Sequence, residues 1–486
     1  MAISLKFLLQ ACLLLVCLLC SSLENTNAKL PGEDQRPHSH IVSVSSLLPS
    51  TICNRSRKVS SKGTSFELVH KYGPCSELKN GKASTPSWSQ ILLKDQVRVR
   101  AINTRRRYMN SDRNRFGPSK AMTFPFGYDL AIGGGEFYAK VDIGTPGQSN
   151  YVIFDTGSDI TWIQCKPCSK CFKQPGPIFD PSKSSTHSTI PCNSPKCLLL
   201  SASNPPHPRG CMSNKCFYAS AYGDGSYTLG YFVQDKLTFR SADPKSNLIV
   251  KNYLLGCGLN NSDVNPAGSI GLMGLSRAPI SFVYQTAPLF KKYFSYCLPS
   301  DFSSTGYITF GKPDDLNNKY IKFTPIPTTP QQSQFYDVVI TGISVAGKNL
   351  PIKSSVYTKG GAVIDSGTVV TRLQPEAYAA LRSAFRKEMS RYKMAAPDGN
   401  TDTCYDFSKY ETVVVPKISF FFKGEVELEV DVKGIFLPNS LKQVCLAFAA
   451  ADEGDGATLG NIMQRSIQVV HDVDGGRVGF GPGTCT

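Results

Sequence analysis

Several residue patterns that would assign a function class are missing from this chain of 486 residues. Apart from one apolar run near the N-terminus, no stretch is long and apolar enough to cross a bilayer. Heptad repeats are absent, which argues against a coiled coil. His471 and Asp472 are adjacent, but no Ser lies in an elbow context that would complete a serine-hydrolase triad.

Glycine and proline, in contrast, are frequent. The chain has 40 Gly and 32 Pro, and 41% of its residues are hydrophobic. This composition is typical of a globular, turn-rich protein, most easily an all-β one. The length leaves room for two domains with sizeable cores after removal of a leader.

The first 28 residues have the pattern of a secretory signal peptide. Lys6 precedes an apolar run from Phe7 to Cys20, and the small residues Thr26 and Ala28 suit cleavage after Ala28. The alternative is an uncleaved membrane anchor. We predict cleavage, which leaves no transmembrane anchor.

The net charge of +16 is concentrated in one segment. Residues 29–120 contain 18 Lys and Arg against 6 Asp and Glu, whereas the chain from Ala121 onward contains 34 against 30. A helix is predicted within this basic segment from Ser87 to Tyr108, with apolar residues at helical spacings. These are Ile91, Leu92, Val99 and Ile102.

Two stretches related in pattern carry the candidate chemistry. They are YVIFDTGSDITW at 151–162 and GAVIDSGTVVTRL at 361–373. In each, a short apolar strand ends in an Asp that is followed by a small hydroxyl residue, a Gly and a second hydroxyl residue. One such tripeptide is a common Asx-turn. Two copies in one chain predict that Asp155 and Asp365 meet.

Two carboxylates in contact cannot both ionise cheaply, so they share one proton, and one acts as a base while the other acts as an acid. Such a pair can activate water against an amide bond without a metal, a cofactor or a covalent nucleophile. The neighbouring hydroxyls and glycines are expected to orient the charged oxygens. They are Thr156, Gly157, Ser158, Ser366, Gly367 and Thr368.

With these motifs, the chain resembles the pepsin-type aspartic endopeptidases, and more narrowly their plant nepenthesin-like branch, from about Phe137 to the C-terminus. GEFYAKVDIGTP before the first Asp, and then YGDGS (222–226), GLMGLS (271–276) and TLGNIM (458–463), follow the order of that family. The resemblance implies an all-β, bilobal fold with two related β-barrel-like lobes, a cleft between them and few short helices. It also implies a pro-segment at 29–120, an N-terminal lobe at 121–330 and a C-terminal lobe at 331–486.

The resemblance assigns a flap to the hairpin around Tyr222. Tyr222 matches the flap tyrosine, Gly223 and Gly225 flank Asp224 at a flexible tip, and Trp162 matches the tryptophan behind the flap. A mobile hairpin over a cleft excludes water and holds an extended peptide. Without the resemblance, the same residues are an ordinary β-hairpin and a core tryptophan.

Of the 17 Cys, three lie in the signal peptide, and Cys53 and Cys75 lie in the pro-segment. The remaining 12 imply up to six disulfides in an exported chain. The cluster CKPCSKC at 165–171 could also be a zinc knuckle, but no His lies at ligand spacing, so no metal is predicted. Relatives have a bridged Cys-rich insertion, here 165–216. The resemblance implies the pairs Cys165–Cys168, Cys192–Cys216, Cys197–Cys211, Cys171–Cys257, Cys297–Cys485 and Cys404–Cys445.

The basic segment has two interpretations. As a pro-segment, it pairs with acidic groups at the cleft, including the catalytic carboxylates, until acid weakens those pairs. As a nucleic-acid arm, it binds phosphates without sequence preference, as in the relatives described as chloroplast-nucleoid proteases. We favour the pro-segment. Of two sequons, at Asn54 and Asn260, only Asn260 would remain as a glycan site in the mature chain.

The function predicted is a secreted zymogen of an aspartic endopeptidase that acts on proteins or peptides at acidic pH as a monomer. The apoplast is the expected location, with the vacuole or plastid as alternatives. One rival is a non-catalytic binding or inhibitor protein of the same fold. Another is a DNA-associated protease that keeps its basic segment.

Overall fold

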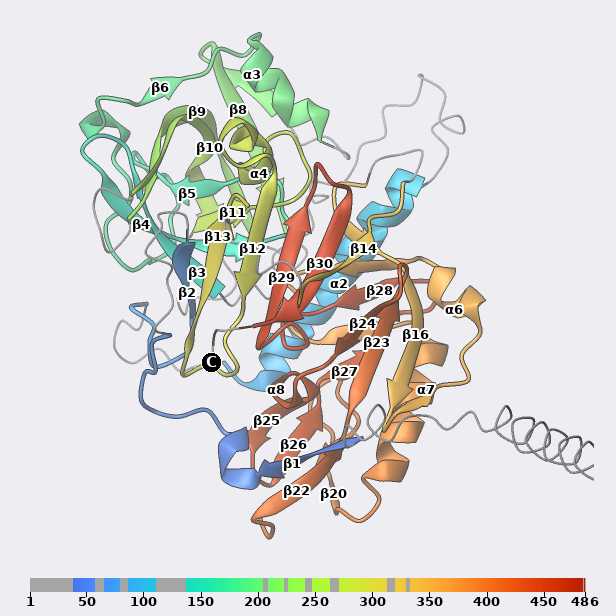
Figure 1. The fold of residues 1–486 in the computed structure, drawn as a ribbon. Helices are drawn as coiled ribbons and strands as arrows, with labels where there is room; N and C mark the ends of the chain where they lie inside the picture. Colours follow the sequence, from blue (N-terminus) through green and yellow to red (C-terminus); the bar gives the residue numbers. More distant parts are fainter. Residues whose placement is uncertain are drawn as a thin grey trace, which may run out of the picture. The chain divides into compact units, whose positions relative to one another are not determined.

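The computed structural model describes residues 38–56, 65–78, 86–110, 137–203, 209–222, 226–240, 247–262, 271–312, 320–328, 333–483 and 485. The predicted signal peptide and the glycine-rich tip at 223–225 lie outside these residues. The described chain is mostly β-structure, as predicted (Figure 1).

The largest sheet has fifteen strands and joins the N-terminal half to the C-terminal hairpin. Its strands, in spatial order, are β14 (Lys322–Pro325), β30 (Arg477–Pro482), β29 (Ile467–Asp472), β12 (Tyr293–Cys297), β13 (Thr305–Phe310), β2 (Ser65–His70), β3 (Phe137–Ile143), β4 (Gln148–Asp155), β11 (Gly271–Gly274), β5 (Trp162–Gln164), β10 (Leu248–Ser262), β9 (Tyr227–Phe239), β8 (Lys215–Ala221) and β7 (Arg209–Met212), with β6 (Ser188–Thr189) paired to β9.

The C-terminal half contains four smaller sheets. The five-stranded sheet consists of β15 (Tyr336–Val338), β18 (Ala362–Ile364), β28 (Ala457–Leu459), β19 (Thr371–Leu373) and β27 (Phe448–Ala450). One four-stranded sheet consists of β17 (Lys348–Asn349), β16 (Ile340–Val345), β23 (Ile418–Phe422) and β24 (Val426–Glu429), and the other of β20 (Met394–Ala395), β21 (Cys404–Tyr405), β26 (Gln443–Leu446) and β25 (Phe436–Ser440). The two-stranded sheet pairs β1 (Ser39–Ser43) with β22 (Thr412–Pro416).

Helices are short, with two exceptions. The long ones are α2 (Trp88–Asn110) in the basic segment and α7 (Pro375–Glu388), which begins at a proline, a residue favoured in the first turn. The others are α3 (Pro195–Leu198), α4 (Phe282–Gln285), α5 (Ala287–Phe290), α6 (Ser354–Thr358) and α8 (Val432–Ile435), with 3-10 turns η1 (Val44–Leu47), η3 (Pro181–Lys183) and η4 (Leu199–Ala202). Because Pro288 cannot donate a backbone hydrogen bond, the segment from Ser281 to Phe290 forms two short helices, α4 and α5.

The two Asp-bearing strands have equivalent surroundings. β11 pairs parallel with β4 and antiparallel with β5, and β28 pairs in the same way with β18 and β19. The GLMGLS and TLGNIM motifs supply these inserted strands. The chain thus builds the same local arrangement twice.

The basic segment at 29–120, called the leader from here on, contributes strands as well as the predicted helix. The sequence did not predict these strands. β2 lies between β13 and β3 in the largest sheet, and β1 pairs with β22 of the C-terminal half. A disulfide between Cys53 and Cys75 ties this part of the leader together. It is therefore built into the fold.

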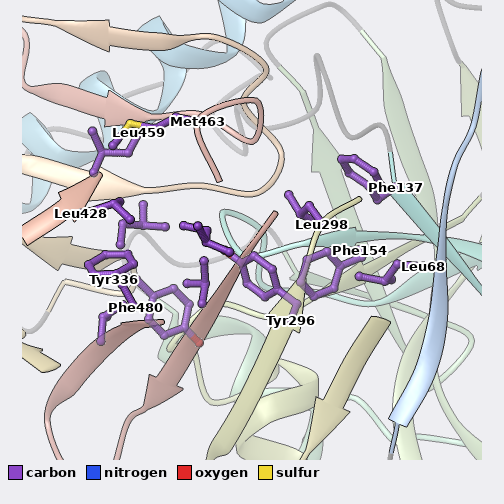
Figure 2. Close-up of a cluster of buried hydrophobic side chains, with 14 of the residues drawn as sticks. Leu68, Phe137, Phe154, Tyr296, Leu298, Tyr336, Leu428, Leu459, Met463 and Phe480 are labelled. Atoms are coloured by element: carbon purple, nitrogen blue, oxygen red, sulfur yellow. The ribbon is translucent and has the colours of Figure 1, made fainter. Parts of the chain in front are cut away.

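The main hydrophobic cluster takes side chains from both halves and from the leader (Figure 2). Leu68 of β2, Phe154 of β4 and Phe480 of β30 all belong to it. His471 is buried beside it, stacked on Phe294 at 4.5 Å between ring centroids. Burial lowers the pKa of His471 to about 3, so this imidazole is neutral and belongs to the packing.

Seven disulfides form among the residues that the structure describes, and the predicted partners were only partly right. Cys297–Cys485 and Cys404–Cys445 are confirmed, whereas the other four predicted pairs are wrong. The structure pairs Cys165 with Cys257, Cys168 with Cys171, Cys192 with Cys211 and Cys197 with Cys216.

Strand pairing explains these corrections. β5 runs parallel to β10 with Ile163 opposite Cys257, which brings Cys165 to a Cα distance of 5.3 Å from Cys257. Cys211 and Cys216 face each other across the β7–β8 hairpin. The buried Cys197 of α3 joins the buried Cys216, and the exposed Cys211 is left for Cys192.

Leu68→Ala tests whether the leader belongs to the core. Leu68 is fully buried, so its truncation should lower the free energy of unfolding of the full chain by about 2–5 kcal/mol, measured by denaturant titration. Leu93→Ala is the matched control, because Leu93 is 67% exposed on α2. Equal unfolding midpoints for the two variants would contradict the position of β2.

Candidate active site

Two tight loops hold the predicted aspartates. Asp155 is the last residue of β4, and Asp365 directly follows β18. The inserted strands fix both backbones, because Leu275 N–H donates to Asp155 O at 2.9 Å and Asp365 N–H donates to Leu459 O at 3.1 Å. Both carboxylates are fully buried.

The two loops bind each other through equivalent hydroxyl residues. Thr156 N–H donates to Ser366 Oγ at 3.1 Å, and Ser366 N–H donates to Thr156 Oγ1 at 2.9 Å. This reciprocal pair fixes the loops against each other. Thr156 and Ser366 therefore join the two loops, in addition to the orienting role that the sequence predicts for them.

Each carboxylate receives the same two donors from its own loop. Gly157 N–H and Ser158 Oγ donate to Asp155 at 2.9 and 2.5 Å. Asp365 receives the equivalent bonds at 3.2 and 2.5 Å, from Gly367 N–H and Thr368 Oγ1. These hydrogen bonds stabilise the ionised carboxylates and fix their orientation.

The two glycines explain why the carboxylates can approach. A Cβ on Gly157 would lie 2.7 Å from Asp365 Oδ1, and one on Gly367 would lie 2.6 Å from Asp155 Oδ1. Each glycine therefore lies against the carboxylate of the opposite loop. Any side chain at either position would push the pair apart.

A single arginine of the leader joins both aspartates. Arg98 of α2 donates to Asp365 through Nε and Nη2, both at 2.8 Å, and to Asp155 through Nη1 at 3.1 Å and Nη2 at 2.6 Å. Nη2 thus contacts one oxygen of each carboxylate. The arrangement shows that Asp155 and Asp365 lie within reach of one atom, as predicted from the sequence.

Comparisons with known proteins agree with this geometry. The family described as Xylanase inhibitor N-terminal matches residues 137–312, and that described as Xylanase inhibitor C-terminal matches residues 335–482. An aspartyl protease family protein of Arabidopsis thaliana is 40% identical over 97% of this chain and 98% of its own length. Aspartic proteinase nepenthesin-2 of Nepenthes gracilis is 34% identical over 81% of this chain and 87% of its own length.

The chain belongs to the plant aspartyl protease family. Among solved structures, conglutin gamma from lupine seeds matches with a TM-score of 0.58 at 22% identity, over 72% of this chain and 92% of its own. Basic 7S globulin from soybean matches with a TM-score of 0.56 at 20% identity, over 73% and 92%. These two show the fold, which is the pepsin-like one.

In this member of the family, α2 is held by further ion pairs on both sides of Arg98. Asp95 contacts Arg372 and accepts the N–H of Val369 at 2.6 Å and of Val370 at 3.4 Å. The C-terminal part of the helix contributes several arginines. The pairs are Arg100–Asp452, Arg105–Asp159, Arg106–Asp337 and Arg107–Asp455.

Most of α2 is buried. Leu93, Arg100 and Arg107 are exposed at a helical spacing, whereas Ile91, Leu92, Val99 and Ile102 are buried as the sequence predicted. Charged residues are also buried, namely Asp95, Arg98, Arg105 and Arg106. Because both apolar and charged side chains face inward, the sequence of this helix has only a weak amphipathic pattern.

Burial and charge move the pKa values of the site in opposite directions. Burial raises the pKa of Asp155, and the nearby charge of Asp365 adds to that rise against the attraction of Arg98. Burial acts on Asp365 in the same sense, but the charge and hydrogen bonds of Arg98, with bonds from Thr368 and Gly367, lower its pKa. Burial also raises the pKa of Asp95, to about 6.

The remaining predicted site residues lie as follows. Tyr222 and Trp162 are both buried, with ring centroids 6.4 Å apart, as expected for a tyrosine in front of a tryptophan. Gly223, Asp224 and Gly225 lie outside the described residues. Asn260 is half-buried, and its Oδ1 accepts a hydrogen bond from Tyr227 at 3.2 Å. Its glycosylation stays a prediction.

Within the described ranges, no helix is long and apolar enough to cross a membrane, and no group of His, Cys, Asp or Glu has the geometry of a metal site. The sequence analysis missed the specific roles of Asp95 and Arg98. The available signal was their spacing of three residues, which places them on one face of a helix.

Acidification is expected to release α2 only below about pH 4. The lowered pKa of Asp365 means that its contribution to holding Arg98 is present above the ordinary value of 3.8 and is lost as the pH falls through the lowered value. Asp95 has the opposite effect: its contribution to holding α2 is present below pH 3.8 and is lost as the pH rises through about 6. Asp95 therefore does not drive release in acid.

Tryptophan fluorescence can follow this release. The chain has two Trp, so Trp162→Phe leaves Trp88, whose Nε1 donates to Pro438 O at 3.2 Å at the start of α2. The emission should shift to longer wavelength below about pH 4 as the indole enters water. Adding Asp365→Asn should remove most of the change between pH 5 and 3. A transition centred near pH 6 would contradict this assignment.

Proposed function

We propose that this chain is the zymogen of an aspartic endopeptidase that hydrolyses peptide bonds of proteins at acidic pH. The observation that carries the proposal is that Asp155 and Asp365, on equivalent loops, share Arg98 Nη2. A water molecule between the same two oxygens would contact both carboxylates. That is the position required of the nucleophile.

The reaction would proceed by general acid–base catalysis. The ionised carboxylate takes a proton from the water as the water oxygen attacks the carbon of the peptide carbonyl. The protonated carboxyl donates its proton to the carbonyl oxygen. Because two carboxylates in contact cannot both ionise cheaply once Arg98 has left, their pKa values differ, which favours such a division of roles. The pair of aspartates is active only while it holds one shared proton, and this requirement favours activity at acidic pH.

Arg98 accounts for latency in this proposal. While it bonds all four carboxylate oxygens, no water can lie between them, and the buried α2 occupies the space that a peptide would need. Release of α2 would then both open the site and return the shared proton. The predicted pro-segment thus obtains a specific inhibitory residue.

Two rival functions are less well supported. A non-catalytic inhibitor of this fold would have no need of two carboxylates, their paired hydroxyls and their glycines in equivalent positions. A nucleic-acid arm would need accessible cations, but Arg98, Arg105 and Arg106 are buried in contact with aspartates of the same chain. Seven disulfides favour an oxidising compartment, consistent with the predicted secretion.

Asp155→Asn and Asp365→Asn should each abolish hydrolysis. Loss of either the acid or the base should lower kcat by roughly 10²- to 10⁴-fold. The measurement is pepstatin-sensitive cleavage of a denatured protein by the acidified full chain, with the new N-terminus determined. Asp337→Asn is the control, because Asp337 contacts Arg106 of α2. Substantial turnover by either dyad variant would place the chemistry elsewhere.

Arg98→Gln should shorten the lag before activity appears after mild acidification. Removing one partner of a buried ion pair is strongly destabilising, so we expect α2 to be released at least about tenfold faster. The matched control is Arg100→Gln, two residues away on the same helix. Its exposed pair with Asp452 contributes little. Equal lags for the two variants would show that Arg98 is not the inhibitory residue.

A further inference from the structure

The carboxylate of Asp95 lies in a pocket whose donors all come from the segment that follows the second catalytic loop. Val369 N–H is 2.6 Å and Val370 N–H 3.4 Å from its oxygens, and Arg372 Nη2 is 3.4 Å away. Asp95 and Arg372 are both fully buried. Two backbone donors and a guanidinium around one carboxylate form a built anion site, one residue beyond Thr368.

Departure of α2 would empty this pocket but leave its donors in place. The N–H groups and the cation belong to the catalytic part of the chain, whereas their acceptor belongs to the leader. After release these donors face water, which the carboxylate of a substrate can displace, as that of Asp95 does in this structure. Arg372 Nε already has no hydrogen-bond partner among the described residues, so the guanidinium can offer a further donor. The pocket therefore favours another carboxylate.

The pocket is close to the reacting centre. Asp95 and Arg98 are three residues apart on α2, which separates them by about 4.5 Å along the helix axis. Since Arg98 lies on the two aspartates, a carboxylate in the pocket would belong to a substrate residue about one or two positions from the bond that is cut. Arg372 also borders a cavity of about 420 Å³, so the pocket has room beside it.

We propose that Val369, Val370 and Arg372 form a carboxylate-binding subsite, which directs the released enzyme to substrates with Asp or Glu next to the scissile bond. Asp95 occupies this subsite in the zymogen in place of the substrate's carboxylate. The inference rests on the proposed function and adds a substrate class to it. Arg372 here is a specificity residue that contacts substrate without taking part in the proton transfers.

Other charges near Arg372 do not replace Asp95. Asp452 acts on it electrostatically but makes no described bond to it, and its side chain is 44% exposed. Arg100 leaves with α2 in the same step. Arg382 and Asp402 line the same cavity and pair with each other. Arg372 thus remains the buried cation that lacks an acidic partner after release.

The test compares peptide substrates of the acid-activated full chain. One set carries a single Asp moved through the three positions on either side of the scissile bond, and a matched set carries Asn at the same positions. The comparison is made at about pH 6, where a free Asp side chain is ionised and a carboxyl with the raised pKa of Asp95 is half ionised. We expect kcat/KM for one Asp position to exceed its Asn counterpart by roughly ten- to a hundredfold, the range for a charge-assisted hydrogen bond.

Arg372→Gln should reduce that ratio to near one while the Asn peptides are still cleaved, and Arg372→Lys should restore part of it. Arg382→Gln, which removes another arginine of the same cavity, should leave the ratio unchanged. Asn peptides with a free or an amidated C-terminus show whether a terminal carboxylate can also bind. A terminal preference that depends on Arg372 would support the carboxylate site.

The possible failures are distinct. Cleavage of the Asp and Asn peptides at equal rates by the wild type, or an unchanged ratio in Arg372→Gln, would overturn the subsite and leave the proposed protease intact. Absence of pepstatin-sensitive cleavage of any peptide would overturn the proposed function and this inference with it. If Arg372→Gln does not fold, Arg372→Lys together with the wild-type ratio decides the question.

Discussion

The candidate active site of Asp155, Asp365 and Arg98 depends on one electrostatic constraint. Two buried carboxylates cannot lie side by side without a cation or a proton between them. In this structure the guanidinium of Arg98 satisfies the constraint, and in the released enzyme a shared proton would do so. The reciprocal bonds of Thr156 and Ser366 hold the loops together in either state. In the proposed zymogen, inhibition and catalysis are therefore alternative ways to meet this constraint.

The same constraint explains why α2, as the proposed inhibitory helix, is rich in buried charge. Apolar contacts of Leu92 or Ile102 act at any pH, whereas ion pairs to carboxylates respond to protons. A helix held only by apolar contacts would have no reason to leave in acid. The pKa of Asp365 is lowered, whereas that of Asp95 is raised. Of these two residues, only Asp365 therefore favours release of α2 as the pH falls.

The sequence predicted what is encoded locally. The strand, Asp, hydroxyl and Gly pattern lies within a few residues and occurs twice, so both Asp-bearing loops could be located from the sequence. The partner of Cys165 depends on the register of β5 against β10, which is set by residues far apart. Arg98 and Arg100 differ by about 200° around the helix, and only packing decides which of them faces the aspartates.

The leader has two parts whose removal would leave different structures behind. Without β2, the facing edges of β13 and β3 would lose the backbone partners that this strand gives them. Without α2, the groups left without their partners are the aspartates that its arginines contact, which water can hydrate, and the donors around Asp95. A peptide substrate with its own carboxylate can replace Asp95 at those donors. α2 is thus the part of the leader that can leave without breaking a sheet, which is the property that the proposed zymogen requires of the segment at its active site.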